Sequence, residues 1–247
     1  MKLQIDRIDQ HSFTSFINRL KLIDSFIYFK IKDGQVISTV YLPQRDAVKH
    51  HSVPFESIFQ TNEVPQLEKE LKVAFFDAGR IIEAFKQFEH DAIRCDIEFI
   101  ENEQDLVAST FRIYNDELEI TLACSEPSLG FKDLTTDQIN AIFAKEEGSF
   151  QFPIDNHTIN KLKSLFNLEK DETFDIKSNG KGVEVKGKTF NVVVSQSAEG
   201  DGNATLYKKY LGLLDKEEYT AHVSSNKVVF DSNDSETLLT ISTCQTA

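Results

Sequence analysis

The sequence predicts an α+β fold of two tandem domains, each built from two units in which a helix precedes antiparallel strands, with the helices on one face. Three observations support this. Apolar residues recur at helical spacing in four separate segments. Runs with alternating apolar residues follow each segment. In both halves a turn with glycine, Asp33-Gly34 and later Asn179-Gly180, separates two such runs, as in a β-hairpin.

The four predicted helices are residues 12–22, 77–89, 158–168 and 204–214. Each has an apolar face at the spacing of a helix packed on a core. Asp9 or Ser12 is positioned to cap the first helix. The apolar faces comprise Phe13, Phe16, Ile17 and Leu20 in the first helix; Ala78, Ile81, Ile82, Phe85 and Phe88 in the second; Ile159, Leu162, Leu165 and Phe166 in the third; and Leu206, Tyr210, Leu213 and Leu214 in the fourth.

The predicted strands follow these helices in the same order in both halves. They are residues 26–31, 36–42, 95–100, 109–114 and 117–123 in the first half, and 173–177, 182–186, 189–195, 219–224, 227–231 and 238–243 in the second. Because a long-period repeat outweighs any local motif, we interpret the chain as a duplication. The pattern recurs, whereas sequence identity between the copies is slight.

This organisation places the first domain at residues 1–124 and the second at residues 150–247, with an interdomain connector at residues 125–149. The connector opens with a Glu126-Pro127-Ser128 turn. Ile139, Ile142 and Phe143 then form a short amphipathic stretch, for which we expect about two helical turns.

Composition narrows the class of protein. The 247 residues are 40% apolar, enough for a large core. No segment reaches the roughly 18–20 consecutive apolar residues of a membrane span, and the N-terminus lacks the apolar region of a signal peptide. We therefore expect a soluble, cytoplasmic protein without membrane contact. Cys95, Cys124 and Cys244 lack metal-ligand spacing and are expected to be reduced thiols.

Charge is distributed unevenly. The chain has a formal net charge of −13, with 40 acidic residues, yet the helices at 12–22, 158–168 and 204–214 contain two basic residues each and no acidic one. Small polar side chains flanked by long cations can contact phosphates without reading bases. The pattern indicates a protein that repels a polyanion over most of its surface and admits one along a particular face. Ordinary solvated helix faces are the alternative interpretation.

Two segments carry a family resemblance. The first is Ser149-Phe150-Gln151-Phe152-Pro153-Ile154, followed by the helix face of residues 158–168. The second is residues 205–223, with Lys208, Lys209 and Tyr219. With the order of elements along the whole chain, they resemble the DNA sliding clamps, which are ring-shaped polymerase processivity factors. The pattern is most similar to the two-domain trimeric clamps of tailed bacteriophages and of the proliferating-cell-nuclear-antigen type.

The resemblance implies a non-catalytic protein that forms a head-to-tail ring of three subunits around duplex DNA, with helices inside and strands outside. The implied partners are DNA without sequence preference, a DNA polymerase and a clamp loader. No cofactor is implied, and a phage-encoded clamp would work in the host cytoplasm. The implied DNA-contacting cations are Arg19, Lys21, Arg80, Lys86, Lys161, Lys163, Lys208 and Lys209. Partner peptides are expected near the connector, with Leu129, Phe131 and Leu134 as candidates.

Two other classes remain open on the sequence alone. One is a structural or assembly protein, such as a virion component built from duplicated α+β domains. The other is a hydrolase or nuclease on the same two-domain scaffold. Self-association and retention on circular DNA separate the clamp from the structural protein, and a metal-dependent turnover assay tests for the nuclease.

Three local motifs are weak. Adjacent side chains of His50 and His51 point apart on a strand, which argues against a metal site. Residues 231–236 lack the glycine and glutamate of a calcium loop and favour a hairpin turn. Residues 200–203 lack a following Gly-Lys-Ser/Thr, so we expect a flexible loop and no phosphate cradle. No catalytic motif is present, and we expect neither a catalytic residue nor a bound metal.

Overall fold

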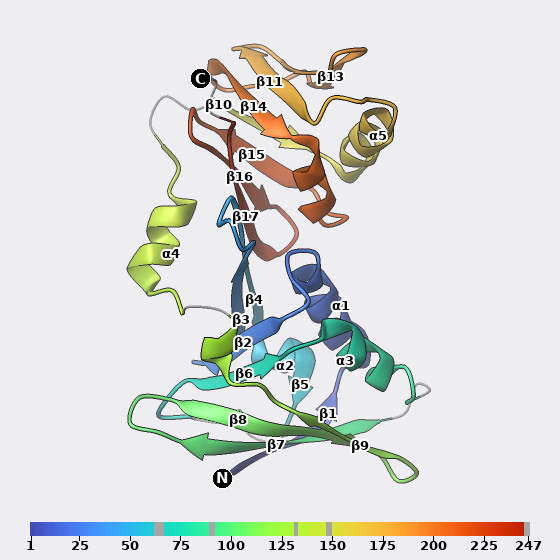
Figure 1. Ribbon diagram of the computed structural model, residues 1–247, viewed down its shortest axis with the longest axis vertical. Helices are drawn as coiled ribbons and strands as arrows, with labels where there is room; N and C mark the ends of the chain where they lie inside the picture. Colours follow the sequence, from blue (N-terminus) through green and yellow to red (C-terminus); the bar gives the residue numbers. More distant parts are fainter. Residues whose placement is uncertain (62–66, 89–91, 131–132, 147–149, 245–247) are drawn as a thin grey trace. The chain divides into compact units, whose positions relative to one another are not determined.

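The computed structural model describes residues 1–61, 67–88, 92–130, 133–146 and 150–244. These residues form two compact units (Figure 1). Unit 1 contains Met1–Val40 and His50–Leu134, and unit 2 contains Tyr41–Lys49 and Thr135–Ala247. The segment Tyr41–Lys49 therefore packs with the second unit, although it lies within the first half of the chain. Within the described ranges, no helix is long and apolar enough to cross a membrane.

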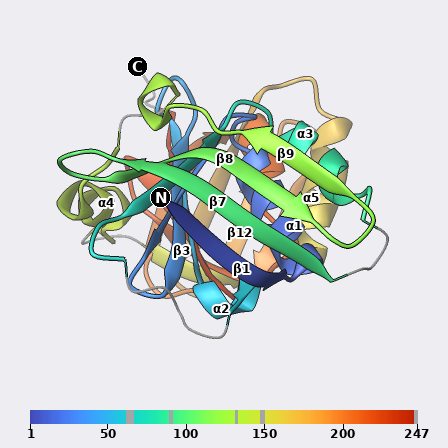
Figure 2. The ribbon, with the colours of Figure 1, turned by 90° about the horizontal axis from the view of Figure 1, so that it is seen from below.

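Unit 1 has its helices on one side of a mainly antiparallel sheet, and Figure 2 shows α1 and α3 behind β1, β7, β8 and β9. The strand order is β3-β2-β6-β8-β7-β1-β5, and β9 also pairs with β8. The helices are α1 (Gln10–Lys21), α2 (Phe55–Ile58), α3 (Ala78–Phe85) and the 3-10 turn η1 (Pro127–Leu129). The strands are β1 (Lys2–Ile8), β2 (Ile27–Lys32), β3 (Gln35–Tyr41), β4 (Ala47–Pro54), β5 (Phe59–Gln60), β6 (Leu71–Phe75), β7 (Ile93–Glu101), β8 (Leu106–Tyr114) and β9 (Glu119–Ala123).

Unit 2 contains two antiparallel sheets. One has the order β10-β15-β16-β17, and the other has the order β13-β12-β11-β14. The helices are α4 (Thr136–Phe143), α5 (Asn156–Asn167) and the 3-10 helix η2 (Lys208–Leu213). The strands are β10 (Phe150–Ile154), β11 (Thr173–Asn179), β12 (Val183–Lys186), β13 (Asn191–Ser195), β14 (Asp201–Tyr207), β15 (Tyr219–Val223), β16 (Lys227–Ser232) and β17 (Glu236–Ser242).

The predicted α+β fold class is confirmed, and the long helices begin and end for simple reasons. Asp9 caps α1 by accepting from the Ser12 N–H at 2.7 Å, and Asp155 caps α5 by accepting from the Thr158 N–H at 2.7 Å. Each of these two helices thus has an acidic residue at its start and none along its length. The helix predicted at 77–89 is shorter, because α3 ends at Phe85 with Lys86 as its C-cap.

The fourth predicted helix, residues 204–214, is wrong. Residues up to Tyr207 belong to β14, which pairs with β11, and only Lys208–Leu213 turn as a 3-10 helix. Ala204 and Leu206 are buried on one side of β14, and alternation of this kind belongs to a strand. The flexible loop expected at residues 200–203 is also wrong, since β14 begins at Asp201. Glycine at residue 202 suits its φ of 151°.

The core of unit 1 is built from phenylalanine rings beneath α1. The ring of Phe13, fully buried, lies 4.8 Å from Phe85, 5.7 Å from Phe111 and 5.9 Å from Phe59, measured between centroids. These neighbours come from α3, β8 and β5, so one side chain of α1 joins three other elements. In unit 2, Phe166 of α5 has the same role and lies 4.6 Å from Phe174 of β11.

Replacing Phe13 with alanine should destabilise unit 1 strongly. The substitution removes a fully buried ring and leaves a cavity, which costs about 3–5 kcal/mol. The measurement is urea unfolding followed by circular dichroism. Phe76→Ala is the matched control, because this ring is 63% exposed and its removal should cost less than about 1 kcal/mol. Equal destabilisation by the two variants would contradict the assigned core.

Candidate nucleic-acid interface

Two of the predicted cations in unit 1, Lys21 and Arg80, lie where α1 ends and α3 begins. The Lys21 ammonium is so near Gly79 that a Cβ at that position would come within 3.5 Å of it. Both side chains are exposed, and within the described ranges neither has an ion-pair partner. The start of α3 adds its own positive dipole, which Asp77 offsets by accepting from the Gly79 N–H at 2.8 Å. The two cations are available to an anion.

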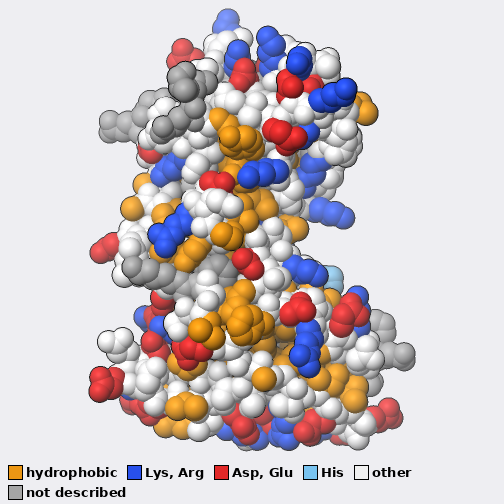
Figure 3. Space-filling view, in the orientation of Figure 1, with side chains coloured by type: hydrophobic (Ala, Val, Ile, Leu, Met, Phe, Trp, Pro, Cys, Tyr) orange, Lys and Arg blue, Asp and Glu red, His pale blue; other side chains and the backbone are white. Residues whose placement is uncertain are grey.

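The other two cations of unit 1 are less available. Arg19 is half-buried in α1. Lys86, just beyond α3, forms an ion pair at 2.6 Å with Glu83 on the preceding turn. In the view of Figure 3, acidic and basic side chains are mixed along the part of unit 1 that carries α1 and α3. The positive charge of this unit is therefore concentrated at Lys21 and Arg80.

In unit 2 the exposed face of α5 is uncharged apart from its cations. Lys161 is exposed, with exposed Asn160, Ser164 and Asn167 on the same helix, and no ion-pair partner for Lys161 lies in the described part of the chain. Figure 3 shows Lys and Arg side chains along the α5 side of this unit. This is the cleanest basic surface among the predicted residues, because no acidic side chain shares the helix.

Lys163 and Lys208 are largely used by the fold. The Lys163 ammonium donates to the Leu214 carbonyl at 3.2 Å, and the Lys208 ammonium donates to the Glu169 carbonyl at 2.9 Å. Burial lowers the pKa of Lys163, and the nearby Lys216 acts in the same direction. The two lysines therefore hold η2 and the chain after α5 in place. Lys216, exposed and close to Lys163, is a basic residue that the sequence analysis missed.

Lys209 lies among aromatic rings. Its ammonium is 4.8 Å from the centre of the Tyr210 ring and 5.4 Å from that of Tyr207, and it is 4.0 Å from an Asp46 carboxylate oxygen. Cation–π contacts of this kind orient a lysine without removing its charge. Its side chain remains exposed.

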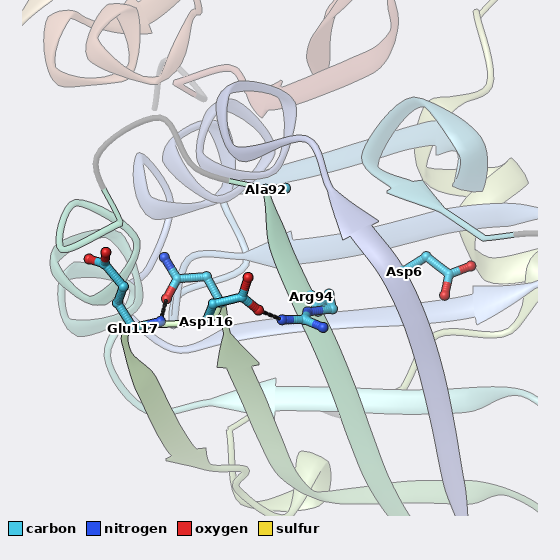
Figure 4. Close-up of a pocket in the computed structure, with 6 residues that line it drawn as sticks. Asp6, Ala92, Arg94, Asp116 and Glu117 are labelled. Atoms are coloured by element: carbon cyan, nitrogen blue, oxygen red, sulfur yellow. Dashed lines mark hydrogen bonds and ion pairs between the residues drawn. The ribbon is translucent and has the colours of Figure 1, made fainter.

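A pocket at the turn between β8 and β9 shows where a polyanion is excluded (Figure 4). It has a volume of about 460 Å3 and is lined by Asp6, Asp116 and Glu117 with Arg94 as the one cation of its lining. Arg94 is paired with Asp116. The acidic lining repels phosphate, so this side of unit 1 is not a nucleic-acid surface.

No metal centre is visible in the described part of the chain, where no three His, Cys, Asp or Glu side chains are grouped to hold an ion. His50 and His51 point to different partners, as the sequence predicts. The Nδ1 of His50 is 2.8 Å from the Thr39 hydroxyl, and the ring of His51 lies 5.2 Å from that of Phe16.

No known protein-family profile and no curated protein matches the sequence. Solved structures do match over the whole chain. PCNA from A. fulgidus, with the C-terminal region of FEN-1 bound, has a TM-score of 0.69 at 14% identity, covering 100% of this chain and 99% of that one. This chain has the sliding-clamp fold. PCNA from Thermococcus kodakaraensis has a TM-score of 0.68 at 12% identity, with 98% and 99% covered. The Helicobacter pylori beta clamp has 0.66 at 10%, with 100% and 64% covered.

Within the clamp fold, the candidate peptide-binding residues occupy different environments. Leu129 is 69% exposed and lines a pocket of about 450 Å3 with Phe76, Arg80 and Leu122. Leu134 is half-buried at the end of unit 1, and Phe131 lies outside the described residues. The structure therefore brings Leu129 into an apolar pocket but does not place Leu134 in its lining.

The chain leaving unit 1 of the clamp fold is held by an ionic cluster. The Asp133 carboxylate lies 2.7 Å from the Lys30 ammonium and 3.0 Å from that of Lys72, and Tyr28 donates to it at 3.4 Å. Burial by itself raises the pKa of Asp133, but the hydrogen bonds and charges of the two lysines outweigh it and lower that pKa. The same contacts with carboxylates help to raise the pKa of Tyr28, after burial. Asp133 is thus an ionised anchor.

The stability provided by Asp133 should depend on pH. Because its folded pKa lies below the unfolded value of 3.8, this stability is present above that value and disappears as the pH falls through the folded pKa. Asp133→Asn should therefore lower the urea midpoint at pH 7 and converge with wild type as the pH falls below about 4. Asp116→Asn, whose carboxylate is 93% exposed, is the control. A difference independent of pH would contradict the ionic role.

Proposed function

We propose that this protein is a DNA polymerase sliding clamp, which closes with other copies of itself into a ring around duplex DNA and tethers a polymerase without catalysis. The observation that carries this proposal is the match to PCNA along the full length of both chains. Exposed cations on acid-free helices support it. A clamp loader and the polymerase are the implied protein partners.

The DNA-facing surface is best supported at Lys21, Arg80 and Lys161. These are exposed, lie on helices of the two units and are not neutralised by a described acidic partner. Lys209 and Lys216 can add charge, whereas Lys163 and Lys208 contribute mainly to stability. Electrostatic attraction between exposed cations and phosphates is weak and screened by salt. Weak binding suffices for a closed ring, because it cannot leave the duplex by sliding, and it leaves the ring free to diffuse.

Two strand edges provide the means of closing the ring. In the described sheets β9 pairs only with β8, and β13 pairs only with β12, so each has one unpaired edge. Val193 of β13 is 57% exposed at such an edge. An open edge is a template for pairing with another chain. We infer that β9 of one copy pairs with β13 of the next, and that two units per chain give a ring of three copies.

Replacing Lys161 with alanine should weaken DNA binding and its dependence on salt. Removing one cation that neutralises a phosphate reduces the slope of log K against log salt concentration by about 0.9. The measurement is fluorescence anisotropy with linear duplex at several salt concentrations. Lys181→Ala, which removes an exposed lysine in the β11–β12 turn, should leave both quantities unchanged. Identical behaviour of the two variants would refute the assigned face.

The ring itself is tested on wild type. After loading by its clamp loader, the protein should remain on nicked circular DNA and should dissociate when the circle is cut open. Retention that survives linearisation would refute topological binding.

Replacing Val193 with aspartate should separate the subunits, because it places a charge at the edge proposed to pair. Wild type should sediment near three times 28.1 kDa and the variant near 28.1 kDa. Ile100→Asp is the matched control, since Ile100 is 68% exposed on β7 and its charge should not change the mass. A wild type that is monomeric at high concentration would exclude the ring.

A further inference from the structure

The connector helix α4 rests on unit 2 through a small apolar cluster of its own. Phe143 is buried against Val48 and Val229, and Ile139 and Ile142 are partly buried beside it. Tyr41 and Leu238 complete the surface beneath the helix. The rest of α4, including Asp137, Asn140 and Ala141, is exposed. The packing of α4 thus depends on three side chains at positions i, i+3 and i+4 of one helix, the spacing with which an amphipathic helix binds a groove.

Alone, α4 would not be a stable helix. It has eight residues, whereas isolated helices shorter than about 12–15 residues are marginal in water. Thr135 and Gln138 form a capping box that supports its first turn. This cap does not replace packing, so the helix should form only while it is docked. Docking and helix formation are therefore one event.

Polar contacts hold the C-terminal end of α4. The Lys227 ammonium donates to the carbonyls of Ala141 and Ile142 at 3.3 and 2.9 Å. It also lies 4.0 Å from Glu146, and Lys145 pairs with Asp231 at 3.2 Å. The latter pair is solvent-exposed, and pairs of this kind contribute little. Any helix that took the place of α4 would find the same lysine ready for its terminal carbonyls and for an acidic residue after them.

We propose that α4 is a removable cover over a binding surface formed by Tyr41, Val48, Val229, Leu238 and Lys227. The ligand would be a short amphipathic segment of a partner protein that copies α4, with apolar residues at i, i+3 and i+4 and an acidic residue soon after. In the free protein α4 occupies the surface and lowers the apparent affinity for the partner by the fraction of molecules that are open. This inference rests on the proposed function, in which the clamp holds other proteins on DNA.

The experiment supplies α4 in trans. A fluorescein-labelled peptide of residues 134–146 is titrated with the full-length protein by fluorescence anisotropy. In Ile139→Asp/Ile142→Asp the attached α4 cannot dock, and this variant should bind the peptide at least tenfold more tightly than wild type does. Asn140→Asp, on the exposed face of α4, is the matched control and should bind as weakly as wild type. Equal affinity for the double variant and wild type would overturn the proposal.

Three further variants locate the binding. Adding Leu238→Lys to the double variant should abolish it, and a peptide carrying Ile142→Asp should not bind. Adding Leu129→Asp should change nothing, because Leu129 lies in the separate pocket of unit 1. Abolition of binding by Leu129→Asp but not by Leu238→Lys would place the ligand elsewhere and overturn the assigned surface.

Hydrogen exchange of wild type tests the cover without substitutions. A removable α4 should exchange its amide hydrogens at least tenfold faster than α5 does, because it opens locally. Exchange as slow as that of α5 would overturn the proposal. The outcome is separable from the clamp function. A clamp with a fixed α4 would still be retained on nicked circles, whereas absent retention with intact peptide binding would refute the ring alone.

Discussion

Burial of one apolar face of each long helix is the constraint on which the rest of the structure depends. Phe13 and Phe166 anchor α1 and α5 to their units, and the neighbouring rings fix the angle at which each helix lies. Once that face is buried, the opposite face is free to vary without reducing stability. This freedom allows an acidic chain to keep acidic side chains off two helices while placing its aspartates at their starts, where they cap.

Patterns confined to one element were predictable from the sequence. The stripes and caps of α1 and α5 and the hairpin turns at Gly34 and Gly180 could be read directly. Segment 204–214 could not, because Leu206 satisfies both a helical period and a strand alternation, and only its pairing with β11 decides between them. Strand β1 was missed because a register shift between Ile5 and Ile8 breaks its alternation.

The candidate site was predictable in charge but not in geometry. Sequence identified cations on acid-free segments, yet Lys163 and Lys208 donate to main-chain carbonyls of segments distant in the chain. Strand β4 was missed for a similar reason. Its Lys49 is fully buried because it pairs with Asp215 at 2.7 Å, so an apparently polar residue occupies a core position. Such pairings depend on the tertiary fold and leave no trace in local periodicity.

The bonds of Lys208 and Lys163 have a consequence for lysine acetylation. An acetylated Lys208 or Lys163 would lose its charge and the donor geometry that holds η2, so the modification would loosen the fold around Glu169 and Leu214. On Lys161 the same acetyl group would remove a charge from the surface and disturb nothing beneath it. Neighbouring lysines on one helix would therefore respond differently to one enzyme, Lys163 through stability and Lys161 through affinity alone.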